Sequence, residues 1–180
     1  MMVEDFIFTT NIISSDICNL VKEKISNREW QPHEWYDYEA NTNLSRSEKE
    51  LEVLWYIDVN EYILKPVSEA VKQYTEKLET GQIISFFSNI RFNRYKAGTL
   101  MASHVDHIHS LFDGESKGIP VLSIVGVLND DFEGGDFICR EKKIPLKEGD
   151  VLIFPSCFMF PHEVSEITAG IRHSFVMWGY

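Results

Sequence analysis

Three residues in the sequence have side chains and spacing suited to binding a metal ion, and two of them lie in the tripeptide His104-Val105-Asp106. On a β-strand, residues i and i+2 point to the same face, so this imidazole and this carboxylate can meet one ion. The alternative is a solvated strand end in a histidine-rich turn, because His107 and His109 follow closely. Strand alternation separates the two possibilities, since the two later histidines would lie on the opposite face.

A third candidate ligand is His162, which follows an aromatic-rich segment containing Phe154, Phe158 and Phe160. A histidine in such surroundings is more often a core or rim residue than a ligand, so this segment alone leaves both interpretations open. Two imidazoles and one carboxylate on adjacent strands form the facial triad that leaves positions open on non-haem Fe(II). Structural zinc prefers four closed ligands, so a set of three fits oxygen chemistry better.

A possible carboxylate-binding pair follows at Arg172 and Ser174, which share one face of a predicted strand with Val176 and Trp178. A guanidinium grips a carboxylate through two parallel hydrogen bonds, and a nearby hydroxyl can add a third. The alternative is a surface arginine paired with one of the 28 acidic residues.

These residues need strands to position them, and the second part of the sequence has the pattern of many short strands separated by turn residues. The predicted strands are 83–95, 100–106, 121–128, 135–140, 150–154, 162–164 and 171–178. Strands at this spacing are typical of a sandwich or barrel.

The first part of the sequence is partly helical. Apolar residues recur at helical intervals in Ser14 to Asn27, after a start that can cap the helix. A second helix is predicted within Trp55 to Leu78, where Pro66 should start or kink it. The polar stretch Gln31 to Glu50 is predicted to be a long loop, either a lid or a surface excursion.

Composition excludes several classes of protein. The 180 residues match one ordinary domain, and the net charge of -11 is the wrong sign for binding a nucleic-acid backbone. The acidic opening predicts no secretory signal, and no apolar run suits a membrane span. The three cysteines Cys18, Cys139 and Cys157 are widely spaced. A disulfide framework or structural zinc site is therefore not expected, and the predicted location is cytoplasmic.

Taken in order, the motifs from about Arg91 to Tyr180 resemble the Fe(II)- and 2-oxoglutarate-dependent dioxygenases, specifically their prolyl 4-hydroxylase-like branch. The resemblance is carried by motifs that occur in the family's order: Arg94-Tyr95-Lys96-Ala97-Gly98, His104-x-Asp106, a hydrophobic strand over Val121 to Asn129, Gly134-Gly135-Asp136-Phe137, Pro145 to Phe154, Pro161-His162-Glu163-Val164, and Arg172-x-Ser174.

The resemblance implies a double-stranded β-helix, or jelly roll, that is mostly β with supporting N-terminal helices. The length and the lack of a linker predict one domain over residues 1–180, with 1–82 as helical support and loop and 83–180 as the catalytic core that the resemblance implies. His104, Asp106 and His162 would be the catalytic metal ligands for Fe(II). Arg172 and Ser174 would hold the distal carboxylate of 2-oxoglutarate, and Tyr95 would donate a hydrogen bond to this co-substrate. O2 is the remaining co-substrate, and ascorbate is a candidate additional cofactor.

The activity implied by the resemblance is hydroxylation of an unactivated C–H bond with release of succinate and CO2. Peptidyl proline is the first candidate substrate by analogy alone, and a free amino acid or small metabolite is the second. The alternative is a non-catalytic or cupin-like metal-binding jelly-roll module. Gly126-Val127 stands where several family members carry an aromatic residue against the co-substrate. Substrate recognition is expected in the first 80 residues and in Ile108 to Gly118.

Overall fold

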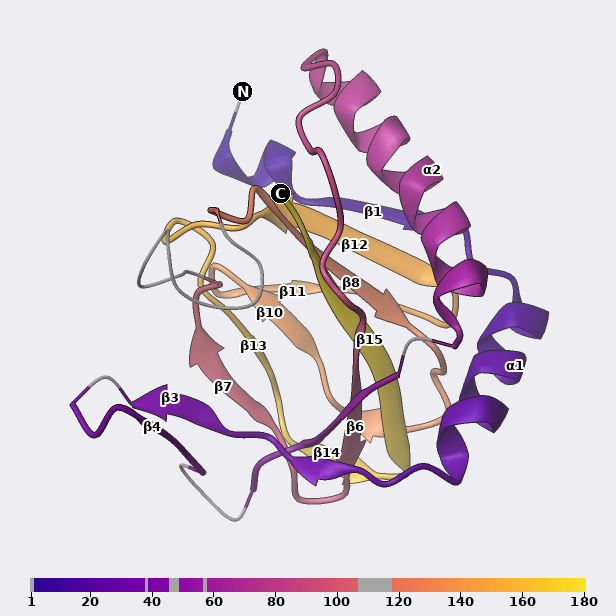
Figure 1. Cartoon of the computed structure of the whole chain (residues 1–180), viewed down its shortest axis with the longest axis vertical. Coiled ribbons are helices and arrows are strands. Elements are labelled where there is room, and N and C mark those ends of the chain that lie inside the picture. The colour runs from indigo at the N-terminus through magenta and orange to yellow at the C-terminus, as the bar shows by residue number, and fades with distance from the viewer. Residues whose placement is uncertain (1, 38, 46–48, 57, 107–117) are drawn as a thin grey trace.

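A computed structural model describes residues 2–37, 39–45, 49–56, 58–106 and 118–180, and most of its regular structure is β-strand (Figure 1). The elements in chain order are η1 (Val3–Phe6), β1 (Phe8–Asn11), α1 (Ser15–Ser26), β2 (Gln31–Pro32), β3 (Trp35–Asp37), β4 (Thr42–Leu44), β5 (Glu52–Trp55), α2 (Asn60–Leu78), β6 (Arg91–Lys96), β7 (Met101–His104), β8 (Leu122–Val127), β9 (Glu133–Gly134), β10 (Phe137–Cys139), β11 (Lys142–Ile144), β12 (Asp150–Pro155), β13 (His162–Val164), β14 (Ile167–Ala169) and β15 (Ile171–Gly179).

Two antiparallel sheets organise the strands. The larger sheet has seven strands in the order β1-β12-β8-β15-β6-β5-β2, and the smaller has four in the order β11-β10-β13-β7. Strands from the first part of the chain therefore form both edges of the larger sheet. Two further pairs, β14 with β9 and β3 with β4, lie outside these sheets.

Both helices cover one face of the larger sheet, as Figure 1 shows. Ser14 caps α1 by accepting a hydrogen bond from the backbone N–H of Ile17, and the helix buries Val21 and Ile25. The longer α2 buries residues at helical spacing, among them Ile63 and Val67. These side chains pack on every second residue of the sheet strands, so the helix-facing side of the sheet is an apolar core.

The opposite face of the larger sheet contributes to a second cluster of buried residues that includes side chains of the smaller sheet. Tyr95, Val125 and Val176 from the larger sheet join Phe137 and Val164 from the smaller one. Because successive residues of a strand face opposite ways, each central strand of the larger sheet contributes to both cores. The candidate ligands lie beside this second core, on or just beyond strands β7 and β13 of the smaller sheet.

Several expected elements differ from those observed. The expected strand over Ile83 to Tyr95 begins only at Arg91, because the preceding backbone forms scattered bonds with the chain around Tyr180. The expected helix from Trp55 begins at Asn60 and runs through Pro66, while Trp55 ends β5. The local pattern missed β5 because its residues gain their partners from β6, far along the chain.

The expected loop over Gln31 to Glu50 contains strand structure. Trp35–Asp37 pairs with Thr42–Leu44 in an antiparallel hairpin. In its turn, the Asp37 carboxylate accepts backbone N–H bonds from Glu39 and Ala40, and Asn41 has a positive φ of 52°. Asp and Asn tolerate such turns, which is the signal that the hydrophobic pattern did not supply.

Among the described residues, no helix is both long and apolar enough to cross a membrane.

Candidate metal centre and carboxylate pocket

Strands β7 and β13 bring the three predicted ligands together. His104 at the end of β7 pairs in register with His162 at the start of β13, and Asp106 follows two residues after His104. One ligand atom from each residue lies within 4.8 Å of the others. Nε2 of His104 lies 3.6 Å from Oδ1 of Asp106, and Nε2 of His162 lies 3.9 Å from Oδ2 of Asp106. Two imidazoles and one carboxylate on one face suit a facial metal site, so the donor set fits Fe(II).

The two histidines present the same nitrogen to the centre. Nδ1 of His104 lies 2.8 Å from the carbonyl oxygen of Ala102, and Nδ1 of His162 lies 3.0 Å from that of Phe160. A carbonyl can only accept, so each Nδ1 carries the proton and each Nε2 keeps a lone pair for a metal. Burial lowers the pKa of His162, which favours the neutral, ligating imidazole.

Asp106 is oriented by two donors from the larger sheet. The hydroxyl of Ser123 donates to Oδ2 at 2.6 Å, and the indole N–H of Trp178 donates to the same oxygen at 3.0 Å. Burial alone would raise the pKa of Asp106, but hydrogen bonding and the neighbouring histidines hold it well below its usual range. The carboxylate is therefore ionised, with Oδ1 turned toward His104.

The predicted carboxylate-binding pair lies in the same cavity. Arg172 is 2% exposed, and its Nη1 donates to the hydroxyl of Ser174 at 2.8 Å. Its guanidinium carbon lies 5.0 Å from the centroid of the Tyr95 ring. No carboxylate of the described residues pairs with Arg172, so the surface-arginine alternative is wrong. A buried guanidinium without an acid partner fits an incoming carboxylate.

The cavity lies between the two sheets. Polar residues of the ligand set and the carboxylate pair line it together with apolar residues of both sheets: Arg91, Asn93, Tyr95, Met101, His104, Asp106, Val125, Phe137, His162, Val164, Arg172, Ser174 and Val176. The structure thus brings all six predicted site residues into one cavity.

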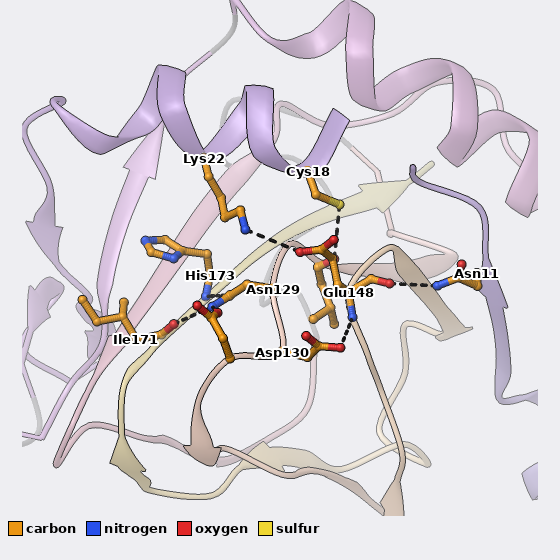
Figure 2. A network of polar contacts seen from close by, with 10 residues as sticks. Asn11, Cys18, Lys22, Asn129, Asp130, Glu148, Ile171 and His173 are labelled. Carbon is orange, nitrogen blue, oxygen red and sulfur yellow. Dashed lines mark hydrogen bonds and ion pairs between the residues drawn. The ribbon is translucent and has the colours of Figure 1, made fainter. Parts of the chain in front are cut away.

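Figure 2 shows a polar network at the end of the larger sheet that includes Asn129, Ile171 and His173. The side-chain amide of Asn129 donates to the carbonyl oxygen of Ile171 at 2.7 Å, and its oxygen accepts the backbone N–H of His173 at 2.7 Å. Asn129 therefore holds the backbone of β15 on both sides of Arg172. Lys22 from α1 reaches Glu148 in the same view, at 3.4 Å.

Position 126 does not face the cavity. Gly126 pairs with Phe175 in register, and a Cβ on Gly126 would lie 2.0 Å from the Phe175 ring. The neighbouring Val125 lines the cavity instead. Position 126 therefore carries no side chain because the Phe175 ring, on the helix-facing side of the sheet, occupies that space. Strand β8 contacts the cavity through Val125.

The β3–β4 hairpin reaches the metal centre at one point. The ring of Trp35 lies edge-on to that of His104, with centroids 5.2 Å apart, and its indole N–H donates to Glu50 at 3.0 Å. His107, His109 and most of Ile108 to Gly118 lie outside the described residues. The histidine-rich turn and the expected recognition segment therefore stay predictions.

Sequence reasoning did not assign roles to Ser123, Asn129 or Arg91. Ser123 lies within a continuous apolar strand, where a single hydroxyl has no spacing signal. Asn129 ends the hydrophobic motif over Val121 to Asn129 and carries no further signal in the sequence. Trp178 was placed on the face of Arg172 by strand alternation, and the structure adds its bond to Asp106.

Comparison with known proteins agrees with this geometry. Residues 90–180 match the 2OG-Fe(II) oxygenase superfamily. A PKHD-type hydroxylase of Acinetobacter baumannii is 36% identical over 94 residues, which are 48% of this chain and 40% of that protein. A PKHD-type hydroxylase of Gluconacetobacter diazotrophicus is 31% identical over the same coverage. The matched segment thus spans less than half the length of these relatives.

Two solved structures share the fold. A prolyl hydroxylase from Trichoplax adhaerens, in complex with a hypoxia inducible factor oxygen degradation domain peptide fragment, has a TM-score of 0.72 at 19% identity, covering 98% of this chain and 84% of that one. A Pseudomonas putida prolyl-4-hydroxylase has a TM-score of 0.72 at 16% identity, covering 97% and 92%. With its matched motifs, its converging ligand set and this fold, the chain belongs to the 2OG-Fe(II) oxygenase superfamily.

Proposed function

We propose that this protein is an Fe(II)- and 2-oxoglutarate-dependent dioxygenase that hydroxylates an unactivated C–H bond and releases succinate and CO2. The observation that carries the proposal is a single cavity containing both a His-Asp-His set and a buried arginine that has no acid partner among the described residues. A metal-binding module that performs no turnover does not need the buried arginine.

Each residue of the cavity has a role in this proposal. His104, Asp106 and His162 hold Fe(II) through two Nε2 atoms and a carboxylate oxygen. Arg172 and Ser174 hold the distal carboxylate of 2-oxoglutarate, beside Tyr95. When bound, Fe(II) with 2-oxoglutarate and O2 supplies oxidative decarboxylation coupled to C–H hydroxylation.

The remaining residues set geometry and exclude water. Ser123 and Trp178 fix Asp106, so that one carboxylate oxygen faces the metal. Val125, Phe137 and Val176 make the wall of the cavity apolar, which strengthens the charged contacts inside it.

The finer features of the expectation belong to this proposal as well. The two antiparallel sheets support a double-stranded β-helix, and strands from residues 1–82 at both edges of the larger sheet support one domain over 1–180. Three free cysteines support a cytoplasmic location. The prolyl hydroxylase neighbours support peptidyl proline as the first substrate to test, followed by free amino acids.

The test is an anaerobic titration of the protein with Fe(II) and 2-oxoglutarate, which follows the visible charge-transfer band of a metal-chelated keto acid. The band should appear for the wild type and disappear for His104→Ala. Arg172→Ala should keep metal binding and weaken 2-oxoglutarate binding. Arg94→Ala is the matched control, because Arg94 pairs with Glu52 on the other face of the sheet.

Two results would contradict the proposal. Fe(II) binding without the band would favour the metal-binding module. Equal 2-oxoglutarate affinity in the wild type and Arg172→Ala would show that Arg172 does not hold the co-substrate. Succinate formation in air then separates turnover from binding.

A further inference from the structure

Arg91 is a cation on the cavity-facing side of β6. Its Nε is buried and makes no hydrogen bond, and within the described residues its guanidinium forms no ion pair. Arg94, three residues along the same strand, instead pairs with Glu52 at 2.6 Å. The guanidinium carbon of Arg91 lies 5.6 Å from the centroid of the Trp178 ring.

Strand alternation directs Arg91 toward the metal centre. Arg91, Asn93 and Tyr95 share the inward face of β6, and all three line the cavity of the candidate ligands. Arg91 lies four residues from Tyr95, or about 13 Å along the strand. It is therefore at the opposite end of the cavity from Arg172, away from the distal carboxylate that Arg172 would hold.

Arg91 also lines a second, outer cavity of about 510 Å³. This volume is in the range of small-molecule sites. Its wall includes Val53 and the half-exposed Trp55, which pairs with Arg91 in register. Glu29 and Glu34 also line it and are exposed. The outer cavity thus combines an inner cation, an apolar wall and outer carboxylates.

The buried Nε of Arg91 is costly, since its lost hydration is not replaced by a hydrogen bond. Burial lowers the pKa of Arg91, and the Asp106 carboxylate opposes this shift. An incoming carboxylate would supply two parallel hydrogen bonds and a compensating charge. Arg91 is thus suited to binding a negatively charged group of a ligand that extends from the outer cavity toward the metal centre.

We propose that Arg91 binds a carboxylate of the prime substrate, and that this substrate is an amino acid whose ammonium group faces Glu29 and Glu34. The inference rests on the proposed function, because it places the oxidised C–H bond between Arg91 and the metal centre. It assigns the outer cavity to the substrate, and Arg172 keeps 2-oxoglutarate.

The test measures succinate formation by the Fe(II)-loaded protein with 2-oxoglutarate, in the presence of each protein amino acid or its carboxamide. At least one amino acid should stimulate turnover, and its carboxamide, which has lost the charge, should not. Arg91→Met should lower kcat/KM for that amino acid at least about 100-fold. Arg91→Lys should restore part of this loss, and Arg94→Met, the matched control, should leave it unchanged.

The charge-transfer titration separates failure of this inference from failure of the proposed function. If the wild type forms no band with 2-oxoglutarate, the proposed function fails. If the band forms, three results overturn the inference alone: no amino acid stimulates turnover, carboxamides stimulate as well as acids, or Arg91→Met binds 2-oxoglutarate as weakly as Arg172→Ala. The last result would assign Arg91 to the co-substrate.

Discussion

The two faces of strands β6 and β15 carry opposite kinds of residues. The helix-facing side presents Phe92, Phe175 and Met177, all fully buried in an apolar core. The cavity-facing side of the same strands presents Arg172 and Ser174, which are equally buried but polar. One pair of strands therefore provides both a stabilising face and a chemical face.

This difference has an energetic meaning. Burying apolar side chains stabilises the fold, whereas burying a charged group without its partner costs free energy. The helix-facing side must therefore offset the cost of the cavity-facing side. Substitutions on the first should change stability with little effect on binding, and substitutions on the second should do the reverse.

The largest expected effect is on activity, from the cavity-facing His104→Ala. Loss of a metal ligand should lower Fe(II) affinity by more than about 100-fold, since even residues that only support a ligand cost 10- to 100-fold. Metal titration and succinate formation measure it. Stability in urea should stay near that of the wild type, and a large loss of stability would contradict the division between faces.

The next effect is on stability, from the helix-facing Phe175→Ala. Phe175 is fully buried and packs edge-on against Phe92, so its removal should cost about 3–5 kcal/mol of unfolding free energy. Urea unfolding measures it. Phe158→Ala, at a side chain that is 74% exposed, should change stability by less than about 0.5 kcal/mol. If folded Phe175→Ala binds 2-oxoglutarate more weakly than the wild type, the two faces of the strands do not act independently.

A smaller effect sharpens the comparison at Asn129, which holds β15 on both sides of Arg172. Asn129→Ala should weaken 2-oxoglutarate binding by about 10-fold, because the guanidinium loses its fixed backbone. Fe(II) affinity should stay unchanged. The charge-transfer titration separates the two constants, and an equal loss of both would mean that Asn129 acts only through global stability.

The smallest effect depends on pH, at the helix-facing His173. Burial, together with Arg94 and Lys22, lowers its pKa to about 4. The unfolded chain, with an ordinary histidine pKa of about 6.5, binds the proton first as pH falls. Stability should therefore decrease from about pH 6.5 to about pH 4, by about 1 kcal/mol once solvent screening of the partly exposed ring is counted.

The matched variant is His173→Gln, which cannot titrate. Urea unfolding at pH 7 and pH 5 should show a smaller decrease for the variant than for the wild type. Identical decreases would show that other groups cause the acid sensitivity. Metal binding at pH 7 should be the same in both, because His173 faces away from the cavity.

Much of the candidate site follows from the sequence because strand alternation is a local rule. The two-residue spacing of Arg172 with Ser174 places this pair on one face of β15 without any knowledge of the sheet order. The strand expected through Asp106 ends at His104 instead, so Asp106 joins the site from the segment that follows β7. The resemblance to a family then joined these local pairs into one site. The structure brings the pairs into one cavity.

The remaining features depend on contacts between distant parts of the chain. The edge strand β1 pairs with β12, and β5 pairs with β6, so neither has a strong local pattern. Arg91 illustrates the same limit, because the sequence shows a cation but not the absence of its partner. Only the folded structure distinguishes Arg91, whose buried Nε makes no hydrogen bond, from the ion-paired Arg94.

The position of β15 has a consequence for how the protein is made. β15 lies in the middle of the larger sheet, between β8 and β6, yet it follows every other strand of that sheet along the chain. During synthesis, the half-sheets β1-β12-β8 and β6-β5-β2 have no shared hydrogen-bonded neighbour until residues 171–179 leave the ribosome. Such late, long-range pairing is slow and leaves sheet edges open to aggregation. Because β15 also carries Arg172, the nascent chain places this arginine in the cavity in the same step that closes its sheet.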